Sequence, residues 1–432
     1  MKINTLQLRD FRGIHELTMN LNSKSAILFG INGVGKSTVL AAINLLYAPI
    51  INRLVNQRFK QAVNLELSDI LSGKASAMLE AEFSFEDVSE VFHYSRSIMY
   101  DNKRDQDIKE IERLLTSFQN KYIGQKRIDE DNNLVYLDEK FNIPIFVNYG
   151  VNRLVLNTPL RFRNRQPFDQ FSAYEKAIEN QIAFSKFFEW FLDQEMYEMQ
   201  QQRENNNYVD VSLTAVKRAT LAMLDGCKNL HITSRPYSMK VTKDGKELDI
   251  LQLSDGEKCT LALFGDLARR LALANPSLAN PLEGEGVVLI DEIELHMHTM
   301  WQRKVLEVLK ETFPNIQFII TTHSPQVLGE VNGEDYNIFS MSRKDNEVLV
   351  QNMESLYGLD TNTVLEDMLG TDSVSKRIKK LVDEMYQSIE VSDYDQAENC
   401  ADMIDELTLN RNADTVRARI MIRRGRIRNA SN

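Results

Sequence analysis

The chain has 432 residues, of which 43% are hydrophobic and 26% charged, a composition typical of a globular protein. No apolar run approaches the length of a membrane span, and the amino terminus opens into a strand rather than a signal peptide. The formal net charge of −11 argues against uniform coating of nucleic acid but leaves room for a local basic groove. Cys227, Cys259 and Cys400 have no metal-ligand spacing, so we expect reduced thiols in a cytoplasmic protein without a membrane contact.

A phosphate-binding pattern lies near the amino terminus. Alternating polarity predicts strands over residues 2–29, with Phe11-Arg12-Gly13 at a turn. The last strand leads into Gly30-Ile31-Asn32-Gly33-Val34-Gly35-Lys36-Ser37-Thr38, where two glycines separated by four residues precede Lys and Ser. The glycines let backbone N–H groups curl around phosphate oxygens, and the helix that follows points its positive end at them. This stretch therefore predicts a nucleotide site.

Within this loop, each polar side chain has an expected task. Lys36 would reach the outer phosphates, and Ser37 would offer its hydroxyl to Mg²⁺. The nucleotide-binding residues that we predict from the loop are Asn32, Gly33, Gly35, Lys36, Ser37 and Thr38.

The middle of the chain alternates between helical and strand patterns. We expect a strand over 77–85, a charged, exposed helical insertion over 102–128, a buried strand over 143–147, a helix or helix pair over 169–203, a helix over 211–227 and a hairpin over 239–251. We assign the aromatic residues around Trp190 to a packed face rather than to a base-stacking platform, because aromatics at helical spacing are usually core.

A second motif suited to phosphate binding follows the predicted hairpin. Leu253-Ser254-Asp255-Gly256-Glu257-Lys258 precedes a strongly apolar helix. The segment resembles the signature motif of ABC-type ATPases, although Asp255 stands where that motif has the first glycine of a pair. A serine and backbone N–H groups at a helix N-terminus favour anionic oxygens. The resemblance implies that Ser254 and Gly256 contact ATP held by the other subunit.

Two further apolar strands end in side chains suited to phosphate chemistry. Residues 286–290 lead to Asp291-Glu292, the Walker B arrangement, and residues 318–322 lead to His323, which resembles the switch histidine of ABC-type ATPases. Open α/β sheets bind ligands at the carboxyl ends of their strands. We therefore expect Asp291 to hold the Mg²⁺ shell and Glu292 to orient or deprotonate the attacking water, while His323 resembles a γ-phosphate sensor.

Two histidines two residues apart, in His296-Met297-His298, could ligate zinc or manganese. The sequence places no third ligand nearby. We favour instead a segment that contacts the partner subunit.

Together, these motifs resemble the SMC/RecF/OLD branch of ABC ATPases. In that branch an aromatic-Arg turn lies near the nucleotide, which implies that Arg12 touches phosphate. Finer features, including Asn148-Tyr149-Gly150-Val151-Asn152-Arg153, resemble the PtuA-like ATPases of Septu and some retron antiphage systems. The glutamine that the branch places after its middle strand is not evident, and Asn148 or Tyr149 lies near that place.

The resemblance implies an α/β fold: a P-loop ABC-ATPase core with a mixed sheet flanked by helices, a helical insertion and a helical C-terminal tail. The expected regions are 1–100, core with the phosphate loop; 101–235, mainly helical insertion with a core strand near 143–148; 236–345, core with signature, Walker B and switch histidine; and 346–432, helical.

The implied activity is slow or regulated hydrolysis of ATP, with Mg²⁺, in a homodimer or higher even oligomer that encloses the nucleotide. In the resembled subgroup the ATPase controls an HNH nuclease, and a retron reverse transcriptase with its DNA is a further candidate partner. Three functions stay open: control of a nuclease in antiphage defence, DNA repair or chromosome maintenance by binding DNA ends, and an ATP-gated scaffold. Glu292 argues against the scaffold, and the lack of a long coiled coil weakens the second.

The carboxyl-terminal region is helical in pattern and strongly uneven in charge. Apolar positions recur at helical spacing over residues 376–408, with acids between them. Residues 411–432 carry many arginines and the single acid Asp414. Because Val416, Ile420 and Ile422 interleave with these arginines, we favour contact with a partner or another copy over contact with DNA.

Overall fold

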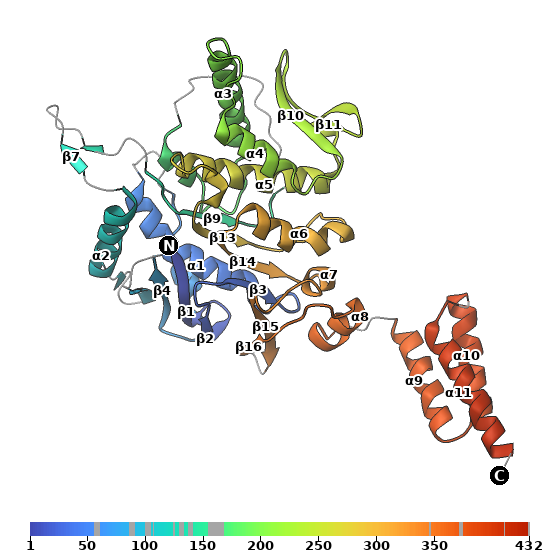
Figure 1. The fold of residues 1–432 in the computed structure, drawn as a ribbon. Coiled ribbons are helices and arrows are strands. Elements are labelled where there is room, and N and C mark those ends of the chain that lie inside the picture. The colour runs from blue at the N-terminus through green and yellow to red at the C-terminus, as the bar shows by residue number, and fades with distance from the viewer. Residues whose placement is uncertain are drawn as a thin grey trace. The chain divides into compact units, whose positions relative to one another are not determined.

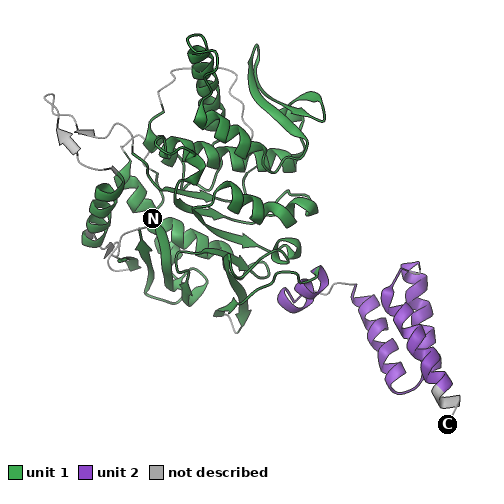
Figure 2. Ribbon diagram, in the orientation of Figure 1, with its two compact units in different colours: residues 1–360 green, residues 361–432 purple. Residues whose placement is uncertain are grey.

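The structure is a computed structural model that describes residues 1–55, 61–85, 91–99, 105–106, 108–123, 126–128, 134–136, 141–153, 168–344, 347–370, 375–409 and 411–430 (Figure 1). The chain forms two compact units, residues 1–360 and 361–432, which Figure 2 shows in different colours.

The first unit is built around a six-stranded sheet with the order β16-β15-β3-β14-β13-β9. All its neighbouring strands run parallel except β16, which runs antiparallel to β15. The bounds are β3 Ser25–Phe29, β9 Ile145–Tyr149, β13 Gly286–Ile290, β14 Ile316–Thr322, β15 Tyr336–Lys344 and β16 Glu347–Met353. Every residue of β9, β13 and β14 is buried, as in parallel sheets covered on both faces. Because β3, β13 and β14 are parallel, the phosphate loop, Asp291 and His323, which follow them, lie at the same carboxyl edge of the sheet.

A second, antiparallel sheet has the order β2-β1-β4-β5-β6. Its strands are β1 Lys2–Phe11, β2 Ile14–Asn20, β4 Ser76–Ser84, β5 Val91–Met99 and β6 Asp105–Gln106. Buried Gln317 of β14 joins the two sheets. Its Nε2 donates to the carbonyl oxygens of Ile3 (2.9 Å) and Lys24 (3.0 Å), and its Oε1 accepts from the Ile3 N–H (2.8 Å).

Helix α1, Lys36–Leu54, contacts strands of both sheets. The ring of Tyr47 stacks on Phe146 of β9, with centroids 3.8 Å apart, and meets the edge of Phe83 of β4 at 5.2 Å. By length and hydropathy α1 passes a simple test for a membrane span, which corrects our statement that no apolar run approaches that length. Most of α1 is buried, as expected of a core helix.

Further helices cover the first unit. Their bounds are α2 Ile108–Phe118, α3 Phe184–Gln202, α4 Val211–Leu221, α5 Asp255–Ala274, α6 Thr299–Thr312 and α7 Pro325–Leu328. Helix α5 contacts β9, and α3 and α4 contact α5. The aromatic side chains around Trp190 of α3 are buried, as we predicted, and Phe187 fits against Gly265 of α5. Among the described residues, two smaller sheets complete the unit: β7 Lys126–Ile128 with β8 Leu134–Tyr136, and β10 Cys227–Ser234, β11 Tyr237–Lys243 and β12 Lys246–Asp249.

Three local expectations differ from the structure. Helix α2 is not an exposed insertion, because Ile111, Leu114 and Phe118 are buried and α2 contacts β5. Residues 102–104, 107 and 124–125 of the expected insertion lie outside the described residues. Helix α4 ends at Leu221 rather than near residue 227, where β10 begins and joins the predicted hairpin. Residues 346–360, which we assigned to the C-terminal region, include β16 of the core sheet.

The second unit contains α8 Thr361–Thr363 and three longer helices, α9 Lys376–Glu390, α10 Tyr394–Thr408 and α11 Ala413–Ala430. Its core contains buried Met385, Ala397, Cys400, Ala401, Ile404, Ala418 and Ile422. The mixed sheet, its flanking helices and this helical C-terminal unit form the α/β architecture that we predicted.

Candidate nucleotide site

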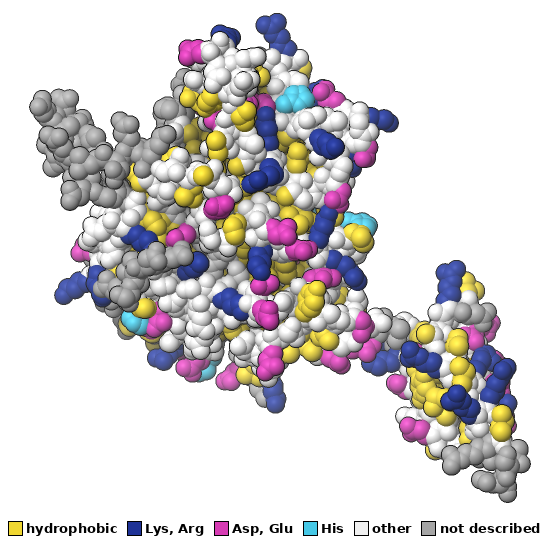
Figure 3. Space-filling model, in the orientation of Figure 1, with side chains coloured by type: hydrophobic (Ala, Val, Ile, Leu, Met, Phe, Trp, Pro, Cys, Tyr) yellow, Lys and Arg dark blue, Asp and Glu magenta, His cyan; other side chains and the backbone are white. Residues whose placement is uncertain are grey.

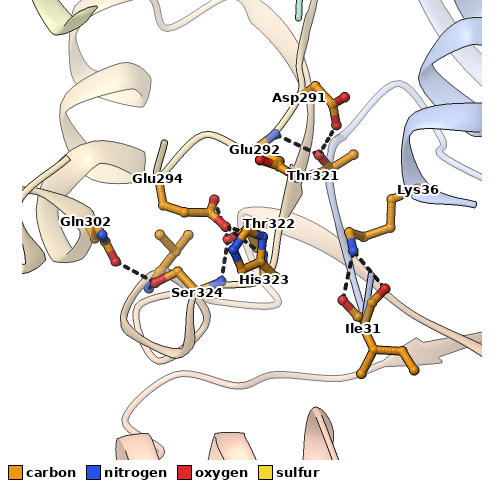
Figure 4. Close-up of polar contacts among 12 residues, drawn as sticks. Ile31, Lys36, Asp291, Glu292, Glu294, Gln302, Thr321, Thr322, His323 and Ser324 are labelled. Atoms are coloured by element: carbon orange, nitrogen blue, oxygen red, sulfur yellow. Dashed lines mark hydrogen bonds and ion pairs between the residues drawn. The ribbon is translucent and has the colours of Figure 1, made fainter. Parts of the chain in front are cut away.

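The phosphate loop joins β3 to α1 at the carboxyl edge of the central sheet. Gly30, Gly33 and Gly35 all have positive φ angles, so the backbone curls as the motif requires. The Lys36 Nζ donates to the carbonyl oxygens of Gly30 (2.8 Å) and Ile31 (3.1 Å) (Figure 4). The ammonium group is therefore held inside the loop, where a phosphate oxygen can compete for it.

Burial lowers the pKa of Lys36. Three carboxylates, those of Glu292, Glu294 and Asp291, oppose this shift. Lys36 thus lies within the electrostatic reach of both predicted Walker B acids. The phosphate-binding cation and the acids form one cluster, as the strand order predicts.

Ser37 and Asp291, the two predicted magnesium ligands, meet directly. The Ser37 hydroxyl donates to Asp291 Oδ1 at 3.1 Å, and the Thr321 hydroxyl donates to the same oxygen at 2.5 Å. A serine hydroxyl beside a carboxylate offers the hard oxygen ligands that Mg²⁺ prefers. The donor set therefore fits Mg²⁺.

Glu292 lies beside the loop with its backbone fixed at both ends. Its φ is +47°, in the left-handed region. Its N–H donates to Thr321 Oγ1 (2.8 Å), and its carbonyl accepts from Arg153 Nη2. Thr321 thus connects both Walker B acids to β14.

The loop and Glu292 enclose a pocket of about 290 Å³. Its lining contains all six predicted loop residues and Glu292, together with Gly13, Val34, Arg343 and Val348. Arg343 and Val348 come from β15 and β16, and sequence reasoning missed both. No motif marks Arg343, and its proximity depends on β15 pairing with β3.

His323 is organised by a buried acid that we had assigned only to the partner-contacting segment. Glu294 Oε1 accepts from the His323 N–H (2.7 Å) and lies 3.0 Å from His323 Nδ1, while its Oε2 accepts from the Thr322 hydroxyl (2.8 Å). The His323 side chain is 43% exposed and does not line the pocket. Glu294, two residues after Glu292, therefore restrains His323, whose side chain lies outside the pocket lining.

Ser254 caps α5 at some remove from this pocket. Its N–H and hydroxyl donate to Glu257 Oε2 at 2.9 and 2.7 Å, and Lys243 donates to Glu257 Oε1 at 2.5 Å. Burial alone would raise the pKa of Glu257, but the hydrogen bonds from Lys243 and Ser254 bring it below its usual value. Neither Ser254 nor Gly256 lines the phosphate pocket of its own chain.

Arg12 is engaged elsewhere. Its Nε donates to Asp69 Oδ1 at 2.8 Å, and its guanidinium lies 5.1 Å from the centre of the Phe11 ring. Arg12 does not line the pocket, although its neighbour Gly13 does. The structure therefore does not place Arg12 with the predicted nucleotide-binding residues.

One histidine of the pair His296 and His298 caps a helix. His298 Nδ1 accepts from the Met300 N–H at 3.3 Å and so caps α6. Among the residues that the structure describes, no group of three or more His, Cys, Asp or Glu is placed to hold a metal ion.

The fold and this pocket define the class: a P-loop nucleotide-binding protein with Walker A and Walker B elements on a mostly parallel sheet. The chain belongs to the family described as "AAA domain, putative AbiEii toxin, Type IV TA system", which matches residues 25–329.

Similar proteins come from bacteria. "Retron Ec83 probable ATPase" of Escherichia coli is 28% identical over 400 residues, covering 80% of this chain and 72% of that protein. "Retron Vc95 probable ATPase" of Vibrio cholerae is 27% identical, covering 79% and 74%. "Septu protein PtuA" of Bacillus thuringiensis is 21% identical, covering 86% and 84%. These relatives confirm the predicted relationship to retron ATPases and Septu PtuA.

Among solved structures, the SMC head bound to the C-winged helix domain of ScpA is 15% identical and superposes with a TM-score of 0.49, covering 82% of this chain and 98% of that one.

Proposed function

We propose that the protein binds ATP with Mg²⁺ and hydrolyses it between two copies of the chain. The observation that carries this proposal is the pocket in which the phosphate loop, the Ser37–Asp291 contact and Glu292 converge. The family and the names of the relatives, two of which are called probable ATPases, support it.

Each side chain has a distinct task. Lys36 and the loop N–H groups bind the phosphates, and Ser37 and Asp291 would hold Mg²⁺, which neutralises charge on the transferred phosphoryl group. Glu292 orients the attacking water and accepts its proton. His323, positioned by Glu294, contacts the outer phosphate from the rim.

Two substitutions test hydrolysis. Lys36→Ala is expected to abolish ATP binding. Glu292→Gln is expected to retain binding and lose hydrolysis by about 10²–10⁴-fold, the usual contribution of a positioned base. Hydrolysis by Glu292→Gln at the wild-type rate would contradict the catalytic assignment.

The position of the signature serine supports the two-copy site. Ser254 is exposed at the N-terminus of α5 and outside its own chain's pocket, so its phosphate-reading role requires a second copy. ATP would then close a dimer and hydrolysis would open it.

Mixed dimers test this arrangement. Ser254→Arg is expected to block hydrolysis without weakening ATP binding to the chain that carries it. A dimer of Ser254→Arg and Lys36→Ala chains has one site with both defects and one intact site, so partial activity should return. No recovery in a confirmed mixed dimer would refute the two-copy site.

We further propose that this ATPase works in the cytoplasm and controls a partner nuclease of the HNH type in antiphage defence. The similarity to retron ATPases and Septu PtuA supports this role over DNA repair or an ATP-gated scaffold. A reverse transcriptase and its DNA are the alternative partner. Purification of the tagged full-length chain from its own host, with identification of bound proteins and DNA, distinguishes these assignments.

The second unit offers a surface for such a partner. One face of α11 pairs internally: Arg419 contacts Asp402 (2.5 Å) and Asp405 (3.0 Å) of α10. The other face exposes Val416 and Ile420, 60% and 49% accessible. Figure 3 shows hydrophobic and basic side chains mixed on the visible face of this unit. An apolar strip with arginines beside it suits an acidic amphipathic segment of a protein better than a nucleic acid backbone.

Deletion of residues 372–432 is expected to leave nucleotide binding intact and to release the partner or reduce the assembly size. Ile420→Asp should reproduce the loss of partner, whereas Val391→Asp, a control at a site 76% exposed, should not. If the deleted chain keeps its partner and size but loses DNA binding at low salt, the tail is a nucleic-acid arm instead.

A further inference from the structure

A buried arginine lies directly behind the Walker B acids. Arg153 follows β9 and is 1% exposed. Its Nη2 donates to the carbonyl oxygen of Asp291 at 2.7 Å and also to that of Glu292. Its Nε and Nη1 have no hydrogen-bond partner in the part of the chain that the structure describes. One guanidinium nitrogen therefore donates hydrogen bonds to two successive carbonyl groups of the predicted catalytic segment.

One of these two hydrogen bonds restrains Glu292, whose backbone has an uncommon conformation. Glu292 has φ +47°, a backbone region that residues other than glycine, asparagine and aspartate seldom adopt. Such a conformation persists only where its surroundings enforce it. The Thr321 hydroxyl holds the N–H of Glu292, and Arg153 holds its carbonyl. Both restraints act on the backbone of Glu292, so they set the direction of its carboxylate.

The charges around Arg153 agree with this location. The carboxylates of Glu294, Asp291 and Glu292 act electrostatically on the Arg153 guanidinium, and the Cys259 side chain also lies within reach of it. Three of these groups belong to the Walker B segment, and Cys259 belongs to the signature helix α5. Arg153 thus lies where the end of β9, the Walker B segment and the signature helix meet.

We propose that Arg153 is a positioning residue for ATP hydrolysis: it fixes the peptide groups of Asp291 and Glu292 so that the Glu292 carboxylate faces the phosphate loop. This role rests on the proposed hydrolysis and adds to it a residue that touches neither nucleotide nor metal. An error of about 1 Å in the position of a catalytic group can cost 10²-fold in rate.

The test compares Arg153→Met and Arg153→Lys with the wild-type full-length chain. The Met variant should lower kcat about 10–100-fold and leave the KM and ATP affinity within about threefold, the pattern of a defect confined to the transition state. The Lys variant, which keeps a donor and a positive charge, should recover part of kcat. Arg269→Lys is the matched control, because Arg269 is also fully buried but pairs with Asp266 (2.8 Å) on α5. It should lower the melting temperature without changing turnover per folded molecule.

Two results would overturn the proposal. One is a folded Arg153→Met chain with wild-type kcat, and the other is a parallel loss of ATP affinity, kcat and melting temperature, which indicates general destabilisation. If Arg153→Met does not fold, the Lys variant must still show a lowered kcat at unchanged KM, and wild-type kcat there overturns the assignment.

A structural measurement separates this proposal from the proposed ATPase activity. In a crystal structure of a folded Arg153 variant, Glu292 should leave its positive-φ conformation. An unchanged Glu292 backbone and carboxylate would refute the positioning role even if hydrolysis is confirmed. Conversely, a wild-type chain that never hydrolyses ATP would refute the activity, while the conformation of Glu292 would still decide the role of Arg153.

Discussion

Replacing Gly30 with alanine is expected to distort the phosphate loop. The added Cβ would clash with strand β15, which carries none of the predicted motifs. Gly30 has φ +148°, and a Cβ built on it would lie 2.1 Å from the carbonyl oxygen of Met341 in β15. Ordinary van der Waals contact begins at 3.4 Å, so loop and strand would have to separate by more than an ångström. Gly30 is thus required by close packing as well as by its φ angle.

Gly33 provides a matched control in the same loop. Its φ is +83°, and a Cβ there would have no atom within 4 Å. Alanine at this position meets only the left-handed backbone penalty, about 1–2 kcal/mol. Gly30→Ala adds the cost of overpacking, typically about 1–3 kcal/mol. The difference between the two variants therefore reports the contact between the loop and β15 together with the difference between their two backbone penalties.

Thermal unfolding followed by tryptophan fluorescence, with and without ATP and Mg²⁺, measures this difference. Both variants should bind ATP more weakly, because both glycines shape the loop. Gly30→Ala should also melt at a lower temperature than Gly33→Ala when no nucleotide is present. Equal melting temperatures, or a more stable Gly30→Ala, would show that the loop does not depend on its packing against β15.

Three further outcomes are expected. Thr321→Val leaves the Glu292 N–H without its partner, so it should cost about 1–3 kcal/mol of unfolding free energy and slow hydrolysis; unchanged turnover in single-turnover assays would contradict this. Arg343→Ala should weaken ATP binding about tenfold by losing one charge-assisted contact without lowering the melting temperature, and calorimetric titration checks it. Arg12→Ala should leave ATP affinity within about twofold, because Arg12 pairs with Asp69; a tenfold loss in the same titration would return Arg12 to the nucleotide site.

Sequence reasoning reached the parts of the site that one short segment provides. The phosphate loop is recognisable because its glycines and Lys36 act together within nine residues. Asp291-Glu292 follows a continuous apolar run, and His323 follows a short apolar run that ends in two threonines. Both patterns predict a buried parallel strand that ends at the ligand edge. The resemblance to SMC/RecF/OLD ATPases implied the overall α/β class, and the structure bears it out.

The remaining parts depend on contacts between segments far apart in the chain. Arg343 reaches the pocket only because β15 pairs with β3, and Arg153 reaches the Walker B segment only because β9 pairs with β13. Neither pairing has a local signal in the sequence. Arg12 is a different case: its neighbour Gly13 lines the pocket, while the Arg12 side chain pairs with Asp69, so its contact with phosphate stays a prediction.

The segment that follows Glu292 connects the chain's own pocket to the surface proposed for its neighbour. A Cβ on Gly256 would lie 2.4 Å from the carbonyl oxygen of His296, so the first turn of the signature helix rests on the Walker B segment with no space between them. Arg153 touches the same segment from the side of β9. Gly256 packs against His296, and Arg153 bonds the carbonyl oxygens of Asp291 and Glu292, so both neighbours restrain the segment from 291 to 296. In the proposed two-copy site, Ser254, two residues before Gly256, would contact the neighbour's ATP. We therefore expect the conformation of Glu292 to be coupled to the phosphate contact proposed for Ser254 of the same chain in the opposite site.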